Sequence, residues 1–136
     1  MSNKNLGSCL CEKVKFEIEG DFESFFLCHC KYCQKDTGSA HGANLFTVNA
    51  KFTWLTGTDL VKTFHLPNTR HVKSFCSNCG SALPSVQGEE KLIVVPAGSL
   101  DTPVNLKPNA HLFMSSRATW EENLQLLPSF DKLPEL

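Results

Sequence analysis

Seven cysteines in three short clusters constrain this chain of 136 residues more than any other feature. They form one Cys-x-Cys pair, one Cys-x-Cys-x-x-Cys triplet and one Cys-x-x-Cys pair, at Cys9, Cys11, Cys28, Cys30, Cys33, Cys76 and Cys79. An odd number of cysteines cannot all pair, and neighbours two or three residues apart rarely have disulfide geometry. Thiolates at such spacings are typical of metal sites, and zinc accepts four sulfurs without redox chemistry.

The first and last pairs predict one closed zinc site with four cysteine ligands. A Gly-Ser dipeptide before Cys9-x-Cys11 lets the chain curl around an ion, and Gly80, directly after Cys79, can adopt the positive φ angle of a metal-binding turn. Two chelating pairs so far apart in the sequence would close a long loop when they meet at one ion. We therefore expect a structural zinc held by Cys9, Cys11, Cys76 and Cys79.

The middle triplet, Cys28, Cys30 and Cys33, has no fourth cysteine left to complete a tetrahedron. Three protein ligands with one exchangeable position are typical of a catalytic zinc, and such a site holds its ion less firmly than a closed one. Two alternatives stay open at this point. One is an iron–sulfur cluster, and the other is a second structural zinc whose fourth ligand is His41, His65, His71 or His111.

The hydrophobic pattern favours an all-β fold. Residues 14–18 alternate between apolar and polar, and further short segments with strand character cover 25–27, 43–48, 52–55, 60–65 and 70–75. Residues 92–95 form a continuous apolar run and predict a fully buried strand. Helical character is confined to a turn after Cys30 and to residues 120–126. Without repeats or linkers, residues 1–136 are expected to form a single domain.

The charge balance and the number of cysteines indicate which binding partners and which cellular compartment to expect. The 13 lysines and arginines are balanced by 14 aspartates and glutamates, which argues against nucleic acid or an acidic membrane as a partner. No signal-peptide pattern and no long apolar stretch are present. Because many unpaired thiols persist only where the environment is reducing, we expect a cytoplasmic protein.

Five segments carry a family resemblance, in the order GSCLCEKVKFEI, LCHCKYCQKDTGSA, FCSNCGSAL, VPAGSLDTP and PNAHLF, followed by Trp120. On these residues the chain resembles the glutathione-dependent formaldehyde-activating enzyme (GFA) family, which includes centromere protein V. The resemblance implies a zinc-binding β-tent of short antiparallel strands. It also implies two zinc ions per chain, a structural one at the first and last clusters and a catalytic one at Cys28, Cys30 and Cys33.

The resemblance implies a carbon–sulfur lyase as well. The expected reaction is reversible addition of the glutathione thiol to formaldehyde, giving S-(hydroxymethyl)glutathione, or the same reaction with a related thiol and aldehyde. The alternative is a non-catalytic zinc-binding interaction module, a role suggested by a related β-tent protein that binds Rab GTPases. Nothing in the sequence indicates the oligomeric state.

Several single residues have two interpretations. His29 could shuttle a proton beside the metal, but a surface-pointing histidine is the simpler expectation. Lys31, Lys35, Arg70 and Arg117 could each bind a glutathione carboxylate or be solvated surface charges. Phe64 is expected in the core. The segment after Leu127 is expected to lie over the core or against a partner.

Overall fold

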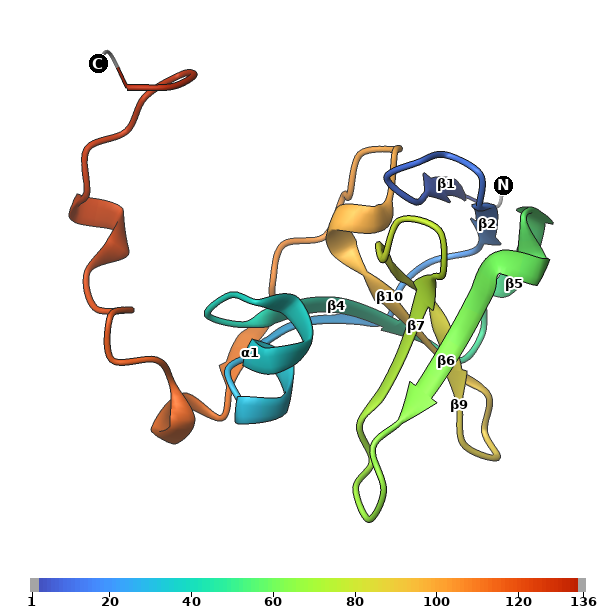
Figure 1. Cartoon of the computed structure of the whole chain (residues 1–136), viewed down its shortest axis with the longest axis horizontal. Helices are drawn as coiled ribbons and strands as arrows, with labels where there is room; N and C mark the ends of the chain where they lie inside the picture. The colour runs from blue at the N-terminus through green and yellow to red at the C-terminus, as the bar shows by residue number, and fades with distance from the viewer. Residues whose placement is uncertain (1–2, 135–136) are drawn as a thin grey trace.

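The computed structural model describes residues 3–134 and contains three small β-sheets, one α-helix and four short 3₁₀ turns within that range (Figure 1). The mostly β architecture that the sequence predicts is therefore confirmed. No helix among these residues is long and apolar enough to cross a membrane.

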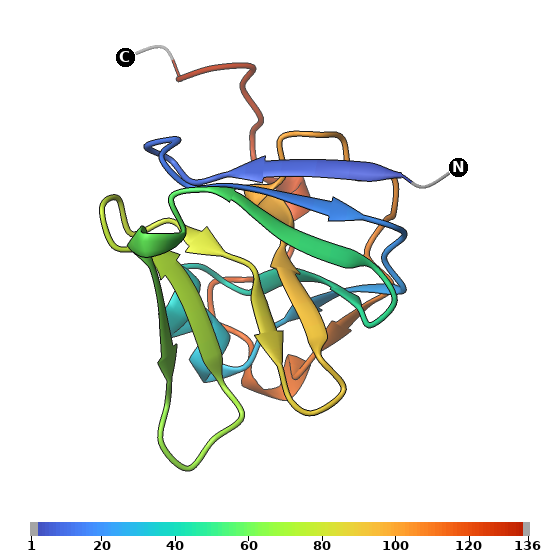
Figure 2. The ribbon, with the colours of Figure 1, turned by 90° about the vertical axis from the view of Figure 1, so that its right-hand side faces the viewer.

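The first sheet has the strand order β1-β2-β5 and is antiparallel throughout. It consists of β1 (Lys4–Ser8), β2 (Lys15–Glu19) and β5 (Lys51–Thr56). Figure 2 shows these three strands side by side along one edge of the molecule. The alternation in β2 has its expected consequence, because Phe16 and Ile18 are both fully buried. Phe16 makes edge contacts with the rings of Phe52 and Trp54 in β5.

The largest sheet has five strands in the order β11-β3-β4-β10-β9. They are β3 (Ser24–Cys28), β4 (Gly42–Thr47), β9 (Ser85–Gln87), β10 (Leu92–Pro96) and β11 (Ala110–Leu112). All its pairings are antiparallel except that of β11 with β3, which is parallel. This one parallel pairing brings the C-terminal part of the chain beside the middle cysteine cluster.

The third sheet is a hairpin with a short added strand, in the order β6-β7-β8. Its strands are β6 (Val61–His65), β7 (Val72–Cys76) and β8 (Ala82–Leu83). The tip of the β6–β7 hairpin extends away from the other two sheets (Figure 2). Phe64 lies on this hairpin and is 52% exposed, so its expected place in the core was wrong. A projecting two-stranded ribbon cannot cover both of its faces.

The remaining described elements are short. Helix α1 (Lys31–Thr37) connects β3 to β4, and 3₁₀ turns cover η1 (Thr58–Leu60), η2 (Ala97–Ser99), η3 (Met114–Ser116) and η4 (Leu124–Leu126). Cys30 is the N-cap residue of α1, and its sulfur accepts a hydrogen bond from the backbone N–H of Cys33 at 3.4 Å. Gly38 is the C-cap residue and adopts the left-handed conformation with φ 66°. Cys30, one of the candidate metal ligands, therefore also caps the helix.

Three further expectations need correction. The apolar run 92–95 is not buried on both faces, because Ile93 and Val95 are buried whereas Leu92 and Val94 are only half-buried. One face of β10 packs into the core, and Val94 on the other face lines a cleft. Residues 120–126 form only the single turn η4, and the chain after Leu127 is exposed and extends away from the sheets (Figure 1). It does not cover the core.

Candidate metal centres and the adjoining cleft

The first and last cysteine pairs meet at one point, as the sequence predicts. Cys9 and Cys11 lie in the turn after β1, whereas Cys76 ends β7 and Cys79 lies in the turn after it. All four sulfurs lie within 4.8 Å of one another. The Sγ atoms of Cys9 and Cys11 are 3.5 Å apart, and those of Cys11 and Cys76 are 3.9 Å apart.

This four-sulfur cluster fits a tetrahedral zinc ion. With Zn–S bonds of about 2.3 Å, the sulfurs of such a site lie roughly 3.8 Å apart. Gly80 has φ 77° and donates its N–H to the carbonyl of Cys76, which closes the turn around Cys79. Burial raises the pKa of Cys79, but the backbone N–H groups of Ser81 and Cys11 outweigh it, and the pKa falls to about 6. The turn thus favours a thiolate.

The middle cluster consists of the Sγ atoms of Cys28, Cys30 and Cys33, again within 4.8 Å of one another. Cys28 is the last residue of β3, Cys30 caps α1 and Cys33 lies in its first turn. Within residues 3–134, no histidine joins these three sulfurs at that distance. All three cysteines are partly exposed. The arrangement is therefore an open set of three ligands that could hold a metal ion.

Close packing of these thiols makes a cation necessary if all three are to ionise. Burial raises the pKa of Cys33 far above its usual range, and the interactions with Cys28 and Cys30 add to this effect. A divalent ion between the sulfurs would reverse this effect, because it replaces repulsion among thiolates by attraction. All seven cysteines of the chain are free of disulfide bonds, which is consistent with both clusters being metal sites.

A cleft of about 230 Å³ opens beside the middle cluster. Its lining residues come from the central strands β3, β4 and β10, from α1, and from the β6–β7 hairpin and β8, with further residues from β9 and β11. Cys28 and Cys33 are among them. The other lining residues include Phe26, Asp36, Thr37, Gly42, Asn44, Phe46, Arg70, His71, Lys73, Ser74, Val94 and Leu112. The cleft is thus partly apolar and carries cationic groups on the hairpin side.

Asp36 joins α1 to the β6–β7 hairpin, both of which line this cleft. Its carboxylate accepts hydrogen bonds from Nε2 of His71 at 2.7 Å and from Nζ of Lys73 at 3.0 Å. Lys73 also donates to the backbone carbonyl of Asp36 at 2.7 Å. Sequence reasoning considered His71 only as a possible zinc ligand and did not predict its pairing with Asp36, since 35 or more positions separate Asp36 from its partners. Only the packing of α1 against β7 reveals their relation.

Of the four cationic residues considered for carboxylate binding, the structure places one in the cleft. Arg70 lines it, whereas Lys31, Lys35 and Arg117 do not. Lys31 and Lys35 are exposed on α1, and Arg117 forms a long ion pair of 3.9 Å with Glu122.

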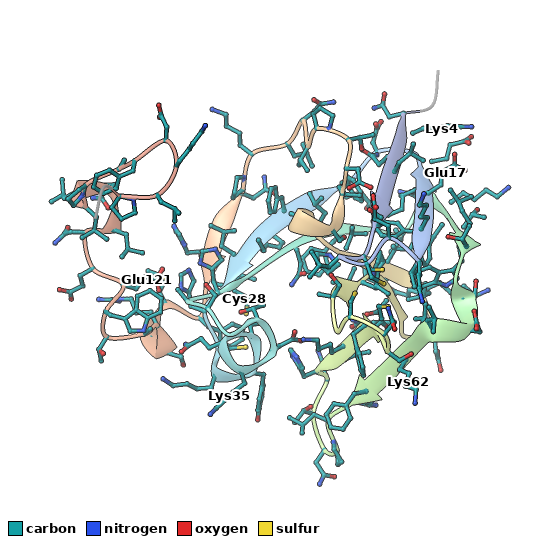
Figure 3. All side chains as sticks on the ribbon, turned by 45° about the horizontal axis from the view of Figure 1, so that its top comes forward. Lys4, Glu17, Cys28, Lys35, Lys62 and Glu121 are labelled. Carbon is teal, nitrogen blue, oxygen red and sulfur yellow. The ribbon has the colours of Figure 1, made fainter. Side chains whose placement is uncertain are left out.

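His29 contradicts the expectation of a surface-pointing side chain, because it is 0% exposed. Its Nδ1 lies 2.7 Å from a carboxylate oxygen of Glu121, and its Nε2 lies 2.9 Å from Nδ1 of His111. The ring of His41 lies 5.0 Å from the ring of His29. Figure 3 labels Glu121 on the C-terminal segment, close to the loop that leaves Cys28. Sequence reasoning missed this group because the C-terminal segment completes it.

These features define a small β protein with two cysteine clusters suited to metal ions, one closed and one open at a cleft. The chain belongs to the glutathione-dependent formaldehyde-activating enzyme family, whose sequence pattern matches residues 4–116. The resemblance recognised in the sequence is thereby confirmed.

The fold is similar to the crystal structure of a Rhodobacter sphaeroides protein, with a TM-score of 0.57. The similarity covers 78% of this chain and 98% of that protein, at 18% sequence identity. At this identity the likeness supports the fold alone. No curated protein sequence matches the chain.

Proposed function

We propose that this protein is a zinc-dependent carbon–sulfur lyase that reversibly adds a small thiol such as glutathione to formaldehyde or a related aldehyde. The observation that carries the proposal is the open set of three cysteines, two of which line a cleft that also carries cationic groups. Family membership supports the same reaction class. In this proposal Cys28, Cys30 and Cys33 form the catalytic metal site.

Zinc bound by these three cysteines would supply ionisation of the incoming thiol at neutral pH. Because three thiolates already donate much negative charge, the cysteine ligands favour this role over strong polarisation of the aldehyde. The cleft would hold the thiol and the aldehyde side by side, which lowers the entropic barrier to their reaction. Arg70 in the cleft wall would attract a carboxylate of glutathione.

The closed cluster would have a structural role in this protein. We propose that Cys9, Cys11, Cys76 and Cys79 hold a second zinc ion, which ties the turn after β1 to the end of β7. The two zinc ions would have different lability, since the three-cysteine site has fewer protein ligands. Seven free thiols also support a reducing, cytoplasmic environment.

NMR exchange spectroscopy of glutathione, formaldehyde and their adduct tests the lyase proposal. The uncatalysed reaction proceeds by itself, so the rate with zinc-loaded protein must be compared with a protein-free blank at the same pH. We expect acceleration by the wild-type protein and none by Cys30→Ser. Metal analysis should show that the variant keeps the ion of the four-cysteine cluster, which establishes that it is folded. Acceleration that persists in Cys30→Ser would exclude the middle cluster from the mechanism.

A non-catalytic interaction module remains the second candidate, and one observation favours it. The C-terminal segment exposes large apolar side chains, among them Leu126, Leu127, Phe130 and Leu133. The exchange measurement separates the two functions. Wild-type protein with both cysteine clusters loaded, but with no acceleration for any small thiol tested, would support the module and reject the lyase.

A further inference from the structure

A third group of potential metal ligands lies outside both cysteine clusters. His29 comes from the loop between β3 and α1, His41 from the loop between α1 and β4, and Glu121 from the C-terminal segment. One ligand atom from each lies within 4.8 Å of the other two. None of the three lines the cleft beside Cys28 and Cys33.

We propose that His29, His41 and Glu121 form a third metal site that binds a divalent transition-metal ion such as zinc. Two imidazoles and one carboxylate are a donor set that zinc and other first-row transition metals use in proteins. This site would be chemically distinct from the cysteine clusters, because it contains nitrogen and oxygen ligands only.

The strongest evidence is an unpaired nitrogen atom. Nδ1 of His41 is buried and has no hydrogen-bond partner, and it is the one such side-chain atom among the described residues. A buried polar atom without a partner costs stability, and native proteins rarely leave one unexplained. A metal ion bound through Nδ1 of His41 would supply the missing interaction.

The side chains of the other two candidate ligands, His29 and Glu121, are also largely buried, which supports a metal site. The side chain of His29 is 0% exposed and that of Glu121 is 9% exposed. The one ion-pair partner that the described residues provide for the Glu121 carboxylate is His29 itself. A buried carboxylate is costly unless a cation compensates it, and a divalent ion does so more fully than one imidazole.

Hydrogen bonds around His29 pre-arrange the ligands. When His29 is neutral, Nδ1–H of His29 donates to the Glu121 carboxylate, and Nε2 of His29 accepts from Nδ1–H of His111. For ligation through Nδ1, the proton of His29 moves to Nε2 and donates to Nδ1 of His111, whose own proton moves to its Nε2. Each ring keeps one proton, so ligation by His29 requires no net deprotonation.

His111 would therefore be a positioning residue and not a ligand. Metal-binding histidines usually donate their second ring N–H to a neighbouring acceptor, which fixes the orientation of the ring. The movement required of His29 and Glu121 relative to each other is small. Ligands of a tetrahedral ion with bonds of about 2.0–2.1 Å lie roughly 3.3 Å apart, compared with 2.7 Å between Nδ1 of His29 and the Glu121 oxygen.

The C-terminal segment is indispensable to this site. The family match ends at residue 116, so His29, His41 and His111 lie inside it and Glu121 lies outside it. Gln34 fastens the segment to α1, because its side-chain amide donates both to the carbonyl of His29 at 2.7 Å and to that of Ser116 at 2.9 Å. The segment is thus held where Glu121 reaches His29.

Metal stoichiometry with matched variants tests this proposal on the full chain. The protein is saturated with zinc, freed of excess ion and analysed for zinc per chain. We expect His41→Ala and Glu121→Gln each to hold one equivalent less than the wild type. The controls His65→Ala and Glu122→Gln change exposed residues of the same types and should keep the wild-type content.

Cobalt substitution provides the second readout. Thiolate-bound Co²⁺ gives intense sulfur-to-metal charge-transfer absorption, whereas a site of nitrogen and oxygen ligands gives only weak visible bands. We expect His41→Ala and Glu121→Gln to lose one equivalent of Co²⁺ with the charge-transfer absorption unchanged. That result would also establish that both cysteine clusters remain folded. Equal metal content in the wild type and both variants would overturn the proposal, as would a loss accompanied by weaker charge-transfer absorption.

Discussion

Gly7 of β1 lies directly against the aromatic ring of Phe16 in β2, so that a Cβ atom at Gly7 would stand 2.1 Å from Cζ of Phe16. The two residues are register partners across the β1–β2 pair. Phe16 is fully buried and held by Phe52 and Trp54, so its ring has nowhere to move. The absence of a side chain at Gly7 therefore allows the core to close next to the first cysteine pair.

Replacing Gly7 with alanine should destabilise the protein, because the added methyl group overpacks the core around Phe16. The expected loss in free energy of unfolding is about 1–3 kcal/mol. Urea denaturation of the zinc-loaded protein measures it. Gly98→Ala is the matched control, since a Cβ at Gly98 would meet no atom within 4 Å and its φ angle is not positive. Equal stability of the two variants would contradict this account.

Replacing Cys76 with serine should abolish the proposed metal binding by the closed cluster and unfold much of the protein. Cys76 is fully buried and joins the end of β7 to the turn after β1. Loss of a metal is among the few single changes that cost about 4 kcal/mol or more. Circular dichroism during denaturation, together with metal analysis, measures the effect. The neighbouring exposed residue provides the control, as Ser77→Ala should retain both metal content and stability.

Replacing Arg70 with alanine should weaken the binding of glutathione without impairing its chemistry. Loss of one charge-assisted hydrogen bond to a carboxylate should raise KM for glutathione about tenfold and leave kcat nearly unchanged. Arg117→Ala should have no such effect, because Arg117 lies outside the cleft. A small thiol without carboxylates, such as 2-mercaptoethanol, should react equally well with the wild type and Arg70→Ala. An equal loss for both thiols would exclude carboxylate recognition by Arg70.

Glu23 should stabilise the fold above its pKa and cease to do so in acid. Its carboxylate accepts hydrogen bonds from the backbone N–H of Val48 at 2.6 Å and from the Thr47 hydroxyl at 3.1 Å, and the Val48 bond is the main reason that its pKa is lowered. The pKa of Glu23 in the folded state lies below its value of about 4.5 in the unfolded state. The stabilisation is therefore present above about pH 4.5 and is lost as the pH falls through the folded-state pKa.

The stability difference between the wild type and Glu23→Gln measures this effect. It should be constant near neutral pH and shrink below the unfolded pKa, as found by urea denaturation at several pH values. Metal release in acid affects both proteins and cancels in the difference. The same substitution at exposed Glu89 supplies the reference. A difference that grows in acid would refute the role given to Glu23.

Much of this protein follows from local sequence. Cys-x-Cys and Cys-x-x-Cys spacings bring two sulfurs close enough to share one metal ion, so the two pairs and the triplet were predictable as chelating units. That the first and last pairs form one cluster was inferred from the number of thiols, since four complete a tetrahedral site. The alternation of apolar residues also predicted the burial of Phe16 and Ile18 in β2. These features depend on bond geometry and on a period of two, which neighbouring residues determine among themselves.

Tertiary structure alone decided the relations between distant segments. Nothing near His29 in the sequence indicates that it is buried or that Glu121, 92 positions away, bonds to it. The parallel pairing of β11 with β3 and the Gln34 hydrogen bonds bring that segment to it. Likewise, Asp36 meets His71 and Lys73 only because α1 packs beside β7. Such contacts depend on how sheets and segments pack, and no local pattern of residues encodes the partner of a side chain that lies across the fold.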